Sequence, residues 1–400
     1  FEGWLSIPHN YYNHLLMEGL LSLACIGGYV HLAIKEKKWD VDRATLINWI
    51  APAGRWSLIV MYFYGVFHKI NTDWFITEVS CASEMWKQYY IRLPEWLENA
   101  VWAQYCAIYG TLIIELMIMI GLIFRSRYSK WAIILGVLFH GILLGFNHYK
   151  YFLNFSAFTF ALHFLFLTPE TLRNWQESKW YRRLSEDKTY PQLIMVLIGI
   201  FILSAYFLRQ GNYAPVYMFW LFYTIAVFYF LLRFAEYPLR RGRLTYNAQL
   251  YSPSQFINLM SILFFINGLT PYIGHKTEVS IAMFSNLYTE GGKTNHLLIP
   301  KPLYIFDYQK EIVTILDSSD PTIKKMAQAK KQMLLVHLRQ MVQRKYDKRS
   351  EASIAYMLND EQRSFEHIKD DPLLNYSLGW WENLLLFKPL DFSNPKLCTH

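Results

Sequence analysis

The hydrophobic pattern along the chain predicts a membrane protein. A helix needs roughly 20 mostly apolar residues to cross a bilayer core of about 30 Å, and eight stretches approach or reach that length. These stretches lie near 13–34, 46–70, 101–124, 131–148, 151–168, 192–209, 216–234 and 255–272. Some of the shorter ones can instead be re-entrant or buried core helices, so at least six complete spans are expected. The pattern therefore indicates an all-α polytopic membrane domain over residues 1–272, with about eight spans.

Basic residues alternate between the connections and predict the orientation. The connections after the first, third, fifth and seventh stretches are rich in lysine and arginine, whereas the intervening ones are poorer in cations. Short loops rich in these residues stay on the cytoplasmic side. The alternation therefore supports all eight spans and places Phe1 and the C-terminal tail on the non-cytoplasmic side.

Composition narrows the class of protein. Hydrophobic residues make up 53% of the 400 residues and charged residues only 18%, whereas an average soluble chain is about 25% charged. This composition argues against a purely soluble or disordered protein. The formal net charge of +8 is explained by cations that flank membrane spans. The expected partner is therefore the lipid bilayer and not nucleic acid.

From about residue 273 the pattern changes to that of a water-facing domain. Tyr304–Leu316 has the pattern of one or two short strands, and Asp320 before Pro321 is typical of a helix start. A helical pattern follows over roughly 321–346. These features predict a small α+β extramembrane domain over residues 273–400, on the non-cytoplasmic side.

The cysteines are far apart in the sequence. Cys25, Cys81, Cys106 and Cys398 form no close pair, so neither a zinc site nor a disulfide framework is indicated, and we expect no metal. If the tail lies outside the cytoplasm, Cys81 and Cys398 can pair in an oxidising compartment. Two free thiols are the simpler interpretation of such distant cysteines.

Six ionisable residues fall inside the apolar stretches, where a charge costs several kcal/mol and function is the default interpretation. They are Glu18, Arg55, Lys69, Glu115, His140 and His163. A helix rises about 1.5 Å per residue, so Arg55 and Glu115 both lie roughly 13 Å from the inner face and are expected to form an ion pair. The pair either fixes helix register or takes part in a proton relay. His140 lies nearer the middle of the bilayer, as a packed core histidine or as a relay member.

Lys69 lies at the outer boundary of the second stretch, in YFYGVFHKINTDW, beside His68 and shortly before Asp73 and Trp74. One interpretation is that its side chain merely extends to the lipid headgroups. The other is that its amine is partly removed from water, is neutral, and takes a proton from a weakly acidic substrate. His14 begins the first stretch on the same outer side, so the two side chains can share a site.

Together these residues resemble the vitamin K-dependent gamma-carboxylase superfamily, whose membrane part is called the horizontally transferred transmembrane (HTTM) domain. In that family a short motif places the lysine credited as catalytic base before an acidic–tryptophan element, which matches Lys69 and Asp73–Trp74. The other matching positions are Asn13, His14, Gly19, Arg55, Glu115, Phe139 and His140. The matches spread over roughly residues 10–170.

The resemblance implies a lyase-like enzyme that uses a membrane quinol. Lys69, oriented by His14, would deprotonate vitamin K hydroquinone or menaquinol so that oxygen can attack the ring. In the family, the strong base so formed takes a proton from a glutamate side chain, after which carbon dioxide adds. A site that faces lipid suits the isoprenoid tail of the quinol and excludes water from the base.

The tail resembles bacterial HTTM proteins, in which the strings PYxGxKT and MFSNLxTEGGxxNHL recur. The segment INGLTPYIGHKTEVSIAMFSNLYTEGG matches only the start of the large lumenal region of the animal carboxylase. The resemblance therefore leaves two candidates for the group that is modified, a protein glutamate and a related substrate. The resemblance also implies a bacterial inner membrane and a chain without the first spans of the family, with Phe1 at the stub of one of them.

A second hypothesis needs no catalysis. The protein would be a membrane scaffold or maturation partner that binds another protein through its C-terminal domain. Lys69 would then be an interface anchor, and MFSNLYTEGGKTNHL would be the more informative segment. The joint presence of His14, Arg55 and Lys69 favours the enzyme, because a scaffold has no need of the set.

Overall fold

The computed structural model divides the chain into two compact units. It describes residues 13–88, 94–124, 128–144, 151–185, 189–209, 214–236, 239–240, 243–244, 249–328, 332–387, 390 and 395–398. The first unit, here the cap unit, comprises Phe1–Gly19, Tyr64–Glu84 and Leu263–His400. The second, here the helical unit, comprises Leu20–Phe63 and Met85–Ile262. The loop after the second long helix therefore folds with the C-terminal part of the chain.

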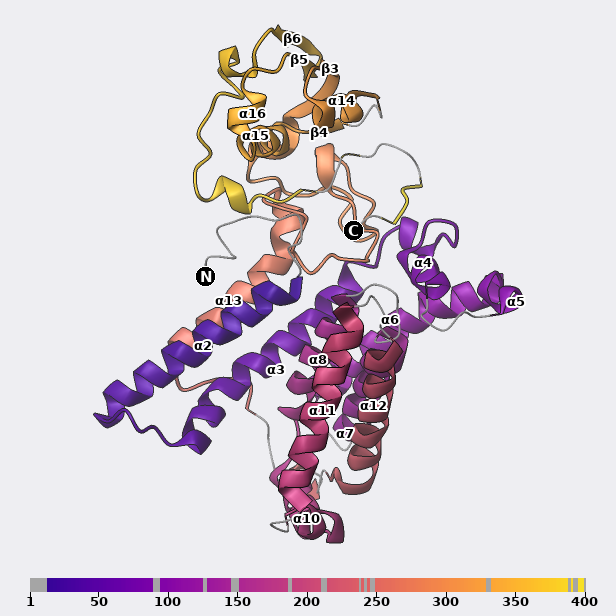
Figure 1. The fold of residues 1–400 in the computed structure, drawn as a ribbon, viewed down its shortest axis with the longest axis vertical. Helices are drawn as coiled ribbons and strands as arrows, with labels where there is room; N and C mark the ends of the chain where they lie inside the picture. Colours follow the sequence, from indigo (N-terminus) through magenta and orange to yellow (C-terminus); the bar gives the residue numbers. More distant parts are fainter. Residues whose placement is uncertain are drawn as a thin grey trace. The chain divides into compact units, whose positions relative to one another are not determined.

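The structure is mostly helical (Figure 1). Its longer helices and a π-helical turn, η2, form in the apolar stretches and their flanks. They are α2 (Asn13–Glu36), α3 (Arg43–Phe67), α6 (Val101–Ile123), α7 (Ser129–Leu138), η2 (Phe139–Leu144), α8 (Tyr151–Phe164), α11 (Thr189–Arg209), α12 (Ala214–Phe234) and α13 (Gln255–Leu269). Shorter helices are α4 (Cys81–Lys87), α5 (Glu95–Glu98), α9 (Pro169–Gln176) and α10 (Lys179–Leu184), and Leu239–Arg240 pairs with Arg243–Leu244 as strands β1 and β2.

Four described helices are long and apolar enough to cross a membrane. They are Leu15–Glu36, Val101–Ile123, Ala214–Phe234 and Gln255–Ile273. A pair bent by 95°, Leu153–Phe164 with Pro169–Gln176, makes a fifth if it is one span. These helices support a membrane protein, but the expectation of about eight spans is not supported within the described residues.

The difference has physical causes. Helix α3 contains Pro52 and Arg55 and buries nearly every residue over 51–62. A helix buried on all sides is a core helix and gains nothing from contact with lipid. The stretch near 131–148 yields only the short apolar helix Ser129–Ile142. The stretch near 151–168 stops before Pro169, because a proline disfavours helical backbone at the residue before it.

Helices of the helical unit pack closely through small residues. Helix α7 contacts α6, α8 and α12, and α11 contacts α12, so these helices run side by side (Figure 1). At the contact of α6 with α7, a Cβ placed on Gly121 would press against the Ala132 side chain. Small residues at such positions let helix backbones approach in a bilayer, where lipid gives no hydrophobic drive to association.

The cap unit contains the α+β fold expected for the tail. Its four-stranded antiparallel sheet has the order β4-β3-β5-β6. The strands are β3 (Ile312–Ser318), β4 (Gln332–Leu334), β5 (Ile354–Leu358) and β6 (Glu361–Phe365), and the helices are α14 (Pro321–Gln328), α15 (Leu335–Gln343) and α16 (Tyr346–Arg349). The core between sheet and helices includes Val313, Leu338 and Tyr356. The helix expected over 321–346 is thus interrupted by a strand, because Met333 and Leu334 pair with β3 and are buried there.

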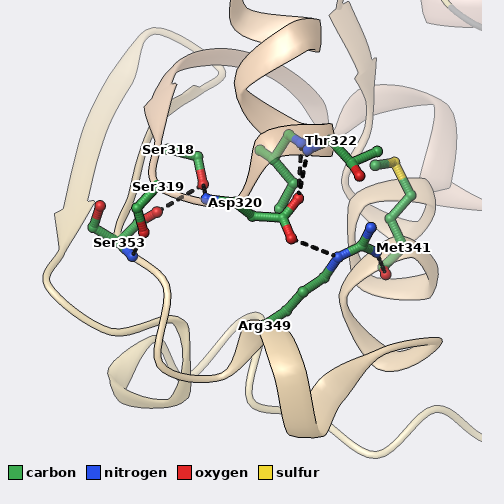
Figure 2. A network of polar contacts seen from close by, with 8 residues as sticks. Ser318, Ser319, Asp320, Thr322, Met341, Arg349 and Ser353 are labelled. Atoms are coloured by element: carbon green, nitrogen blue, oxygen red, sulfur yellow. Dashed lines mark hydrogen bonds and ion pairs between the residues drawn. The ribbon is translucent and has the colours of Figure 1, made fainter.

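The start of α14 confirms the helix signal in the sequence. The Asp320 carboxylate accepts hydrogen bonds from the backbone N–H groups of Thr322 at 2.9 Å and Ile323 at 3.0 Å (Figure 2). It also pairs with Arg349 Nε at 3.1 Å, and Arg349 Nη1 donates to the Met341 carbonyl. Burial acts to raise the pKa of Asp320, but these N–H groups and the guanidinium outweigh it and hold the pKa below its usual value. The network is a helix cap that joins α14 to α16.

A disulfide bond joins Cys81 to Cys398, with a Cα–Cα distance of 5.0 Å. The interpretation of these two residues as free thiols is therefore wrong, and the pairing expected for an oxidising compartment is confirmed. Cys25 and Cys106 are free and exposed. The bond ties the last described residues to the start of α4, across 317 positions of sequence.

Candidate functional site

One buried side chain holds the loop that follows α3. Asn71 is fully buried, and its Nδ2 donates to the carbonyls of His68 at 2.8 Å and Ser285 at 2.6 Å. Its Oδ1 accepts from the Trp74 backbone N–H at 2.9 Å. An asparagine that bonds the main chain in this way replaces the backbone pairs that a loop lacks. The loop therefore has a defined shape, in which Lys69 and Trp74 have fixed positions.

Lys69 and Trp74 lie together in this loop. The Lys69 residue is 6% exposed, and its Nζ lies 5.4 Å from the centre of the Trp74 ring. A lysine buried in protein does not extend to the headgroups, which disfavours the interface-anchor interpretation. Trp74 is fully buried, and its Nε1 has no hydrogen-bond acceptor among the described residues. Buried donors without an acceptor are rare, and such a group requires a water or a ligand oxygen.

His68 has an unusual environment. Its ring is fully buried, with Nδ1 3.3 Å from the Ile281 carbonyl and Nε2 3.1 Å from the Gly268 carbonyl. A carbonyl oxygen only accepts hydrogen bonds, and a neutral imidazole carries one N–H. Both contacts are hydrogen bonds only if the ring is protonated. Burial opposes that charge, so a neutral His68 donates to only one of the two carbonyls.

Asp73 anchors the loop to two other segments. Its Oδ1 accepts from the Thr72 hydroxyl at 3.0 Å, and its Oδ2 accepts from Asn295 Nδ2 at 3.0 Å. The backbone N–H of Lys396 approaches Oδ2 at 3.4 Å. This aspartate, expected as a supporting residue, therefore holds the loop against residues near 295 and against the segment that ends in the disulfide.

The segment 277–299 packs inward against the same loop. His296 Nε2 donates to the Phe67 carbonyl at 2.9 Å, and its Nδ1 accepts from the backbone N–H groups of Leu298 and Ile299 at 3.1 Å each. These partners require the neutral ring, and burial lowers the pKa of His296 in agreement. The recurring asparagine–histidine of this segment thus serves internal packing.

The same segment carries an unusual concentration of strained backbone. Four residues within eight positions have left-handed φ, namely Val279 (57°), Ile281 (64°), Phe284 (55°) and Asn286 (56°). Positive φ is an outlier for β-branched residues and costs of order 1–3 kcal/mol each. Asn286 offsets part of this cost, because its side chain bonds the Cys81 N–H at 2.7 Å and the Val79 carbonyl at 2.9 Å. Such strain persists where a site needs a fixed backbone shape.

A second lysine was missed in the sequence. Lys276 follows the span Gln255–Ile273, is partly exposed, and has no acidic partner in the described part of the chain. Burial lowers its pKa to about 8. Its neighbour His275 also has a lowered pKa, through burial and the Lys276 charge, and its Nδ1 has no partner among the described residues. The string PYIGHKT contains both residues, but nothing in its spacing indicated desolvation.

Arg55 and Glu115 belong to the helical unit and are both buried. The Arg55 guanidinium donates from Nε to the Leu165 carbonyl and from Nη1 to the Gln249 carbonyl, each at 2.8 Å. It therefore holds α3 to the chain just after α8 and just before α13. The expected ion pair with Glu115 stays a prediction, because the described hydrogen bonds of Arg55 go to backbone carbonyls.

His140 is also in the helical unit, in η2, and is buried. Its Nε2 lies 2.8 Å from the Tyr62 hydroxyl, which in turn lies 3.2 Å from His163 Nε2. Tyr62 was not recognised in the sequence, since a tyrosine in an apolar run has no pattern that separates it from its neighbours. The histidines at 140 and 163, noted separately, belong to one group.

The expected site residues therefore fall into two sets. The cap unit holds Lys69, His68, Asp73 and Trp74, and the helical unit holds Arg55, Glu115 and His140. Asn13 and His14 lie at the first positions of α2, but their side chains are outside the described residues. The expected orientation of Lys69 by His14 stays a prediction.

The chain matches no protein-family model, no curated protein and no solved structure. The resemblance to the HTTM domain therefore rests on the motif residues alone, and the function rests on the chemistry of the sites just described.

Proposed function

We propose that the protein is a quinol-dependent membrane enzyme in which the Lys69 amine takes a proton from a quinol hydroxyl. The observation that carries this proposal is the pairing of a buried lysine with a fully buried Trp74 whose Nε1 has no acceptor among the described residues. A quinol hydroxyl that reached both groups would give its proton to the amine and accept a hydrogen bond from the indole. The quinol would supply, on reaction with oxygen, the strong base for a later proton abstraction.

The residues around Lys69 suit a general base. A base must lie within reach of the proton that it takes, in a fixed position. The Lys69 amine is almost fully buried and lies beside the Trp74 ring. Asn71 and Asp73 hold the loop so that the amine and the indole keep their positions. The proposed proton acceptor and hydrogen-bond donor thus come from one short segment.

The disulfide supports a location for this chemistry. Disulfides persist in oxidising compartments and are rare in the cytosol. The bond between Cys81 and Cys398 therefore supports a cap unit on the non-cytoplasmic side of a bacterial inner membrane. The same side follows from the alternation of basic loops. A quinol dissolved in the bilayer reaches a boundary site on that side without leaving the lipid.

The competing function, a scaffold that binds a partner through its C-terminal domain, receives less support. Its signal was the segment MFSNLYTEGGKTNHL, at 283–297. Asn286, Asn295 and His296 in this segment form hydrogen bonds with the protein's own loops. Side chains engaged in this way are not offered to a partner.

The test compares two substitutions of one lysine. Arginine keeps the positive charge and most of the packing but stays protonated, so it cannot act as a base. We expect Lys69→Arg and Lys69→Ala both to lose quinol epoxidation in lipid nanodiscs, at normal abundance in the membrane. The exposed Lys301→Arg is the matched control and should keep full turnover. Full turnover in Lys69→Arg ends the assignment, and loss in Lys276→Arg alone moves it to that lysine.

The indole is tested separately. Trp74→Phe keeps a buried aromatic ring and removes the N–H donor together with part of the indole. If that donor binds a quinol oxygen, the KM for the quinol should rise at least about fivefold, since one hydrogen bond contributes on the order of 1 kcal/mol. An unchanged KM would show that the indole N–H faces water and not substrate.

A further inference from the structure

Three buried side chains from separate elements of the helical unit form one hydrogen-bonded chain. Tyr62 comes from α3, His140 from η2 and His163 from α8. Their exposed fractions are 2%, 1% and 0%. The Tyr62 hydroxyl lies 2.8 Å from His140 Nε2 and 3.2 Å from His163 Nε2, so it bridges the two imidazoles.

A backbone carbonyl sets the direction of this chain. His163 Nδ1 lies 2.7 Å from the Thr159 carbonyl, which can only accept, so Nδ1 carries the hydrogen. In the neutral ring, Nε2 therefore carries no hydrogen, and it accepts a hydrogen bond from the Tyr62 hydroxyl. The Tyr62 oxygen in turn accepts from His140 Nε2–H. With neutral rings, this is the one arrangement of hydrogens that satisfies all three contacts.

The backbone around these three side chains has features that suit the hydrogen-bonded chain. His140 lies in a π-helical turn, and such turns occur mostly as local insertions at functional sites. The Gly141 carbonyl accepts a hydrogen bond from Trp220 Nε1 at 2.9 Å, so the turn is held from α12. A Cβ placed on Gly136 would overlap the His163 imidazole, so that only glycine leaves room for the ring. Polar side chains without a function would need neither the π-helical turn nor a glycine at position 136.

Among the described residues, the charged groups near these three side chains come from α6 and α3. From α6, Glu115 acts electrostatically on the Tyr62 hydroxyl. On α3, Arg55 lies two turns before Tyr62 and donates to the Leu165 and Gln249 carbonyls. From α12, Trp220 and Tyr223 pack against Phe160 of α8, and Thr224 lies beside Gly141. A carboxylate at Glu115 would favour a cation among these rings.

We propose that His140, Tyr62 and His163 form a proton relay whose terminal acceptor is His163. When His140 takes up a proton from the medium, a new N–H bond forms at Nδ1, the Nε2–H bond breaks, and the Nε2 hydrogen forms a covalent bond to the Tyr62 oxygen. The original Tyr62 O–H bond breaks as its hydrogen moves to His163 Nε2. His163 becomes an imidazolium that donates to both Thr159 and Tyr62, and His140 is left neutral with its hydrogen on Nδ1. No electron is transferred, and the ligand of the site is a proton.

The final state keeps every contact of the first. Tyr62 O–H now donates to His140 Nε2, and His163 Nε2–H donates to Tyr62, so all three hydrogen bonds are reversed or retained. A relay keeps all of its hydrogen bonds when their directions reverse. A static network, which only fixes helix register, does not need this property. The relay lies within the helical unit and does not depend on Lys69 as a base.

The experiment follows the ring nitrogens directly. Protein labelled with ¹⁵N-histidine, in lipid bilayers, is titrated toward acid and observed by solid-state NMR, with assignments from His140→Asn and His163→Asn. We expect His163 to change from the Nδ1–H form to the imidazolium in the same pH interval in which His140 changes from Nε2–H to Nδ1–H. If His140 keeps its tautomer while the protein stays folded, or if His163 stays neutral, the relay is overturned.

A tyrosine pair supplies the control. Tyr62→Phe keeps the ring and removes the bridging hydroxyl, so the change at His140 should no longer accompany that at His163. Tyr64→Phe removes a buried hydroxyl that donates to the Phe265 carbonyl, and should leave both changes intact. A coupled change that survives Tyr62→Phe contradicts the relay. If that variant does not fold, the titration of the natural protein still decides, and a failure of the Lys69 test leaves this result unaffected.

Discussion

Two buried polar groups lie near the end of the same helix, yet they are built differently. In the cap unit, the loop around Lys69 is held by side chains that bond to main-chain groups, such as Asn71 to the Ser285 carbonyl. In the helical unit, Tyr62 and its two histidines bond to one another. Loops leave many backbone groups unpaired, whereas helices in a bilayer have already paired theirs. Polar side chains in the loop therefore bond mainly to main-chain groups, whereas polar side chains between the helices bond mainly to one another.

The difference affects how each group should respond to substitution. A side chain that pairs several backbone groups leaves all of them unsatisfied when it is removed, and each costs about 1–3 kcal/mol. A hydroxyl between two side chains leaves partners that can turn or find other groups, and hydrogen bonds between membrane helices average only about 0.6 kcal/mol. The loop is thus the more rigid of the two, and the helical group the more adaptable.

The largest expected effect is therefore in the loop. Asn71→Ala removes two donated and two accepted hydrogen bonds from a fully buried side chain, so we expect a loss of about 3 kcal/mol in unfolding free energy. Thermal unfolding in nanodiscs measures it, beside Tyr62→Phe, which should lose about 1 kcal/mol or less. Equal losses would contradict the distinction between the two groups.

The packing around the helical group is tested by a pair of glycines. Gly136→Ala places a methyl group against the His163 imidazole and should cost about 1–3 kcal/mol, the usual range for overpacking. Gly110→Ala on α6 meets no atom within 4 Å of the added Cβ and should cost nothing. Unfolding temperatures of both variants are compared under one condition. An equal response would show that His163 is free to move aside, and the close fit would be rejected.

Lys276 tests whether the chemistry of the cap unit is confined to one lysine. Its pKa of about 8 leaves roughly half of the amine neutral at pH 8, against about 0.4% for an ordinary lysine, so acetylation there should be on the order of a hundredfold faster than at the exposed Lys301. Because folding lowers this pKa from 10.5, the unfolded chain binds more protons between about pH 8 and 10.5, and stability should rise with pH across that window. Peptide mass spectrometry follows the labelling. Equal rates at the two lysines would remove Lys276 as a second reactive amine.

The smallest effect is expected away from both groups, at the cap of α14. Folding lowers the pKa of Asp320, so its stabilising contribution is present above the unfolded value near pH 3.9 and is lost as the pH falls through the lower folded value. Asp320→Asn keeps an oxygen that can cap the helix but removes the charge that pairs with Arg349, so it should cost about 1 kcal/mol at pH 7. The difference from the natural protein should shrink toward pH 3. A difference that is constant with pH would show that the charge has no role.

Much of the architecture could be predicted because it depends on local composition. The apolar runs at 101–124 and 216–234 form long helices, since a bilayer requires that every backbone group be paired within the segment. The α14 start at Pro321 follows from Asp320, whose carboxylate reaches the first N–H groups of any helix that begins there. Sidedness allowed the pair Cys81–Cys398, but the 317 positions between the two cysteines favoured free thiols, and that interpretation was wrong. The features that were predicted correctly need only a few adjacent residues.

Other features depended on contacts between distant segments. An apolar run cannot reveal whether it faces lipid or protein, so the burial of α3 came from packing alone. The reduced number of spans came from where the helices begin and end, which leaves four described helices long and apolar enough to cross a membrane. The strand Gln332–Leu334 has its own partner in β3, and that pairing overrides the helical pattern of its sequence. Lys276 differs from a surface lysine only because folding removes its amine from water. The spacing of residues in the sequence does not indicate this burial.

The sequence by itself determined the chemistry that was present, namely a lysine, an arginine, two glutamates and two histidines within or at the edge of the apolar stretches. Only the tertiary structure decided which of these groups meet. It separated Lys69 and His140 into two units and joined His140 to His163 through Tyr62, a residue with no polar signature in sequence. The reason is physical: residue type sets the cost of burying a polar group, whereas its hydrogen-bond partners come from elements far apart along the chain.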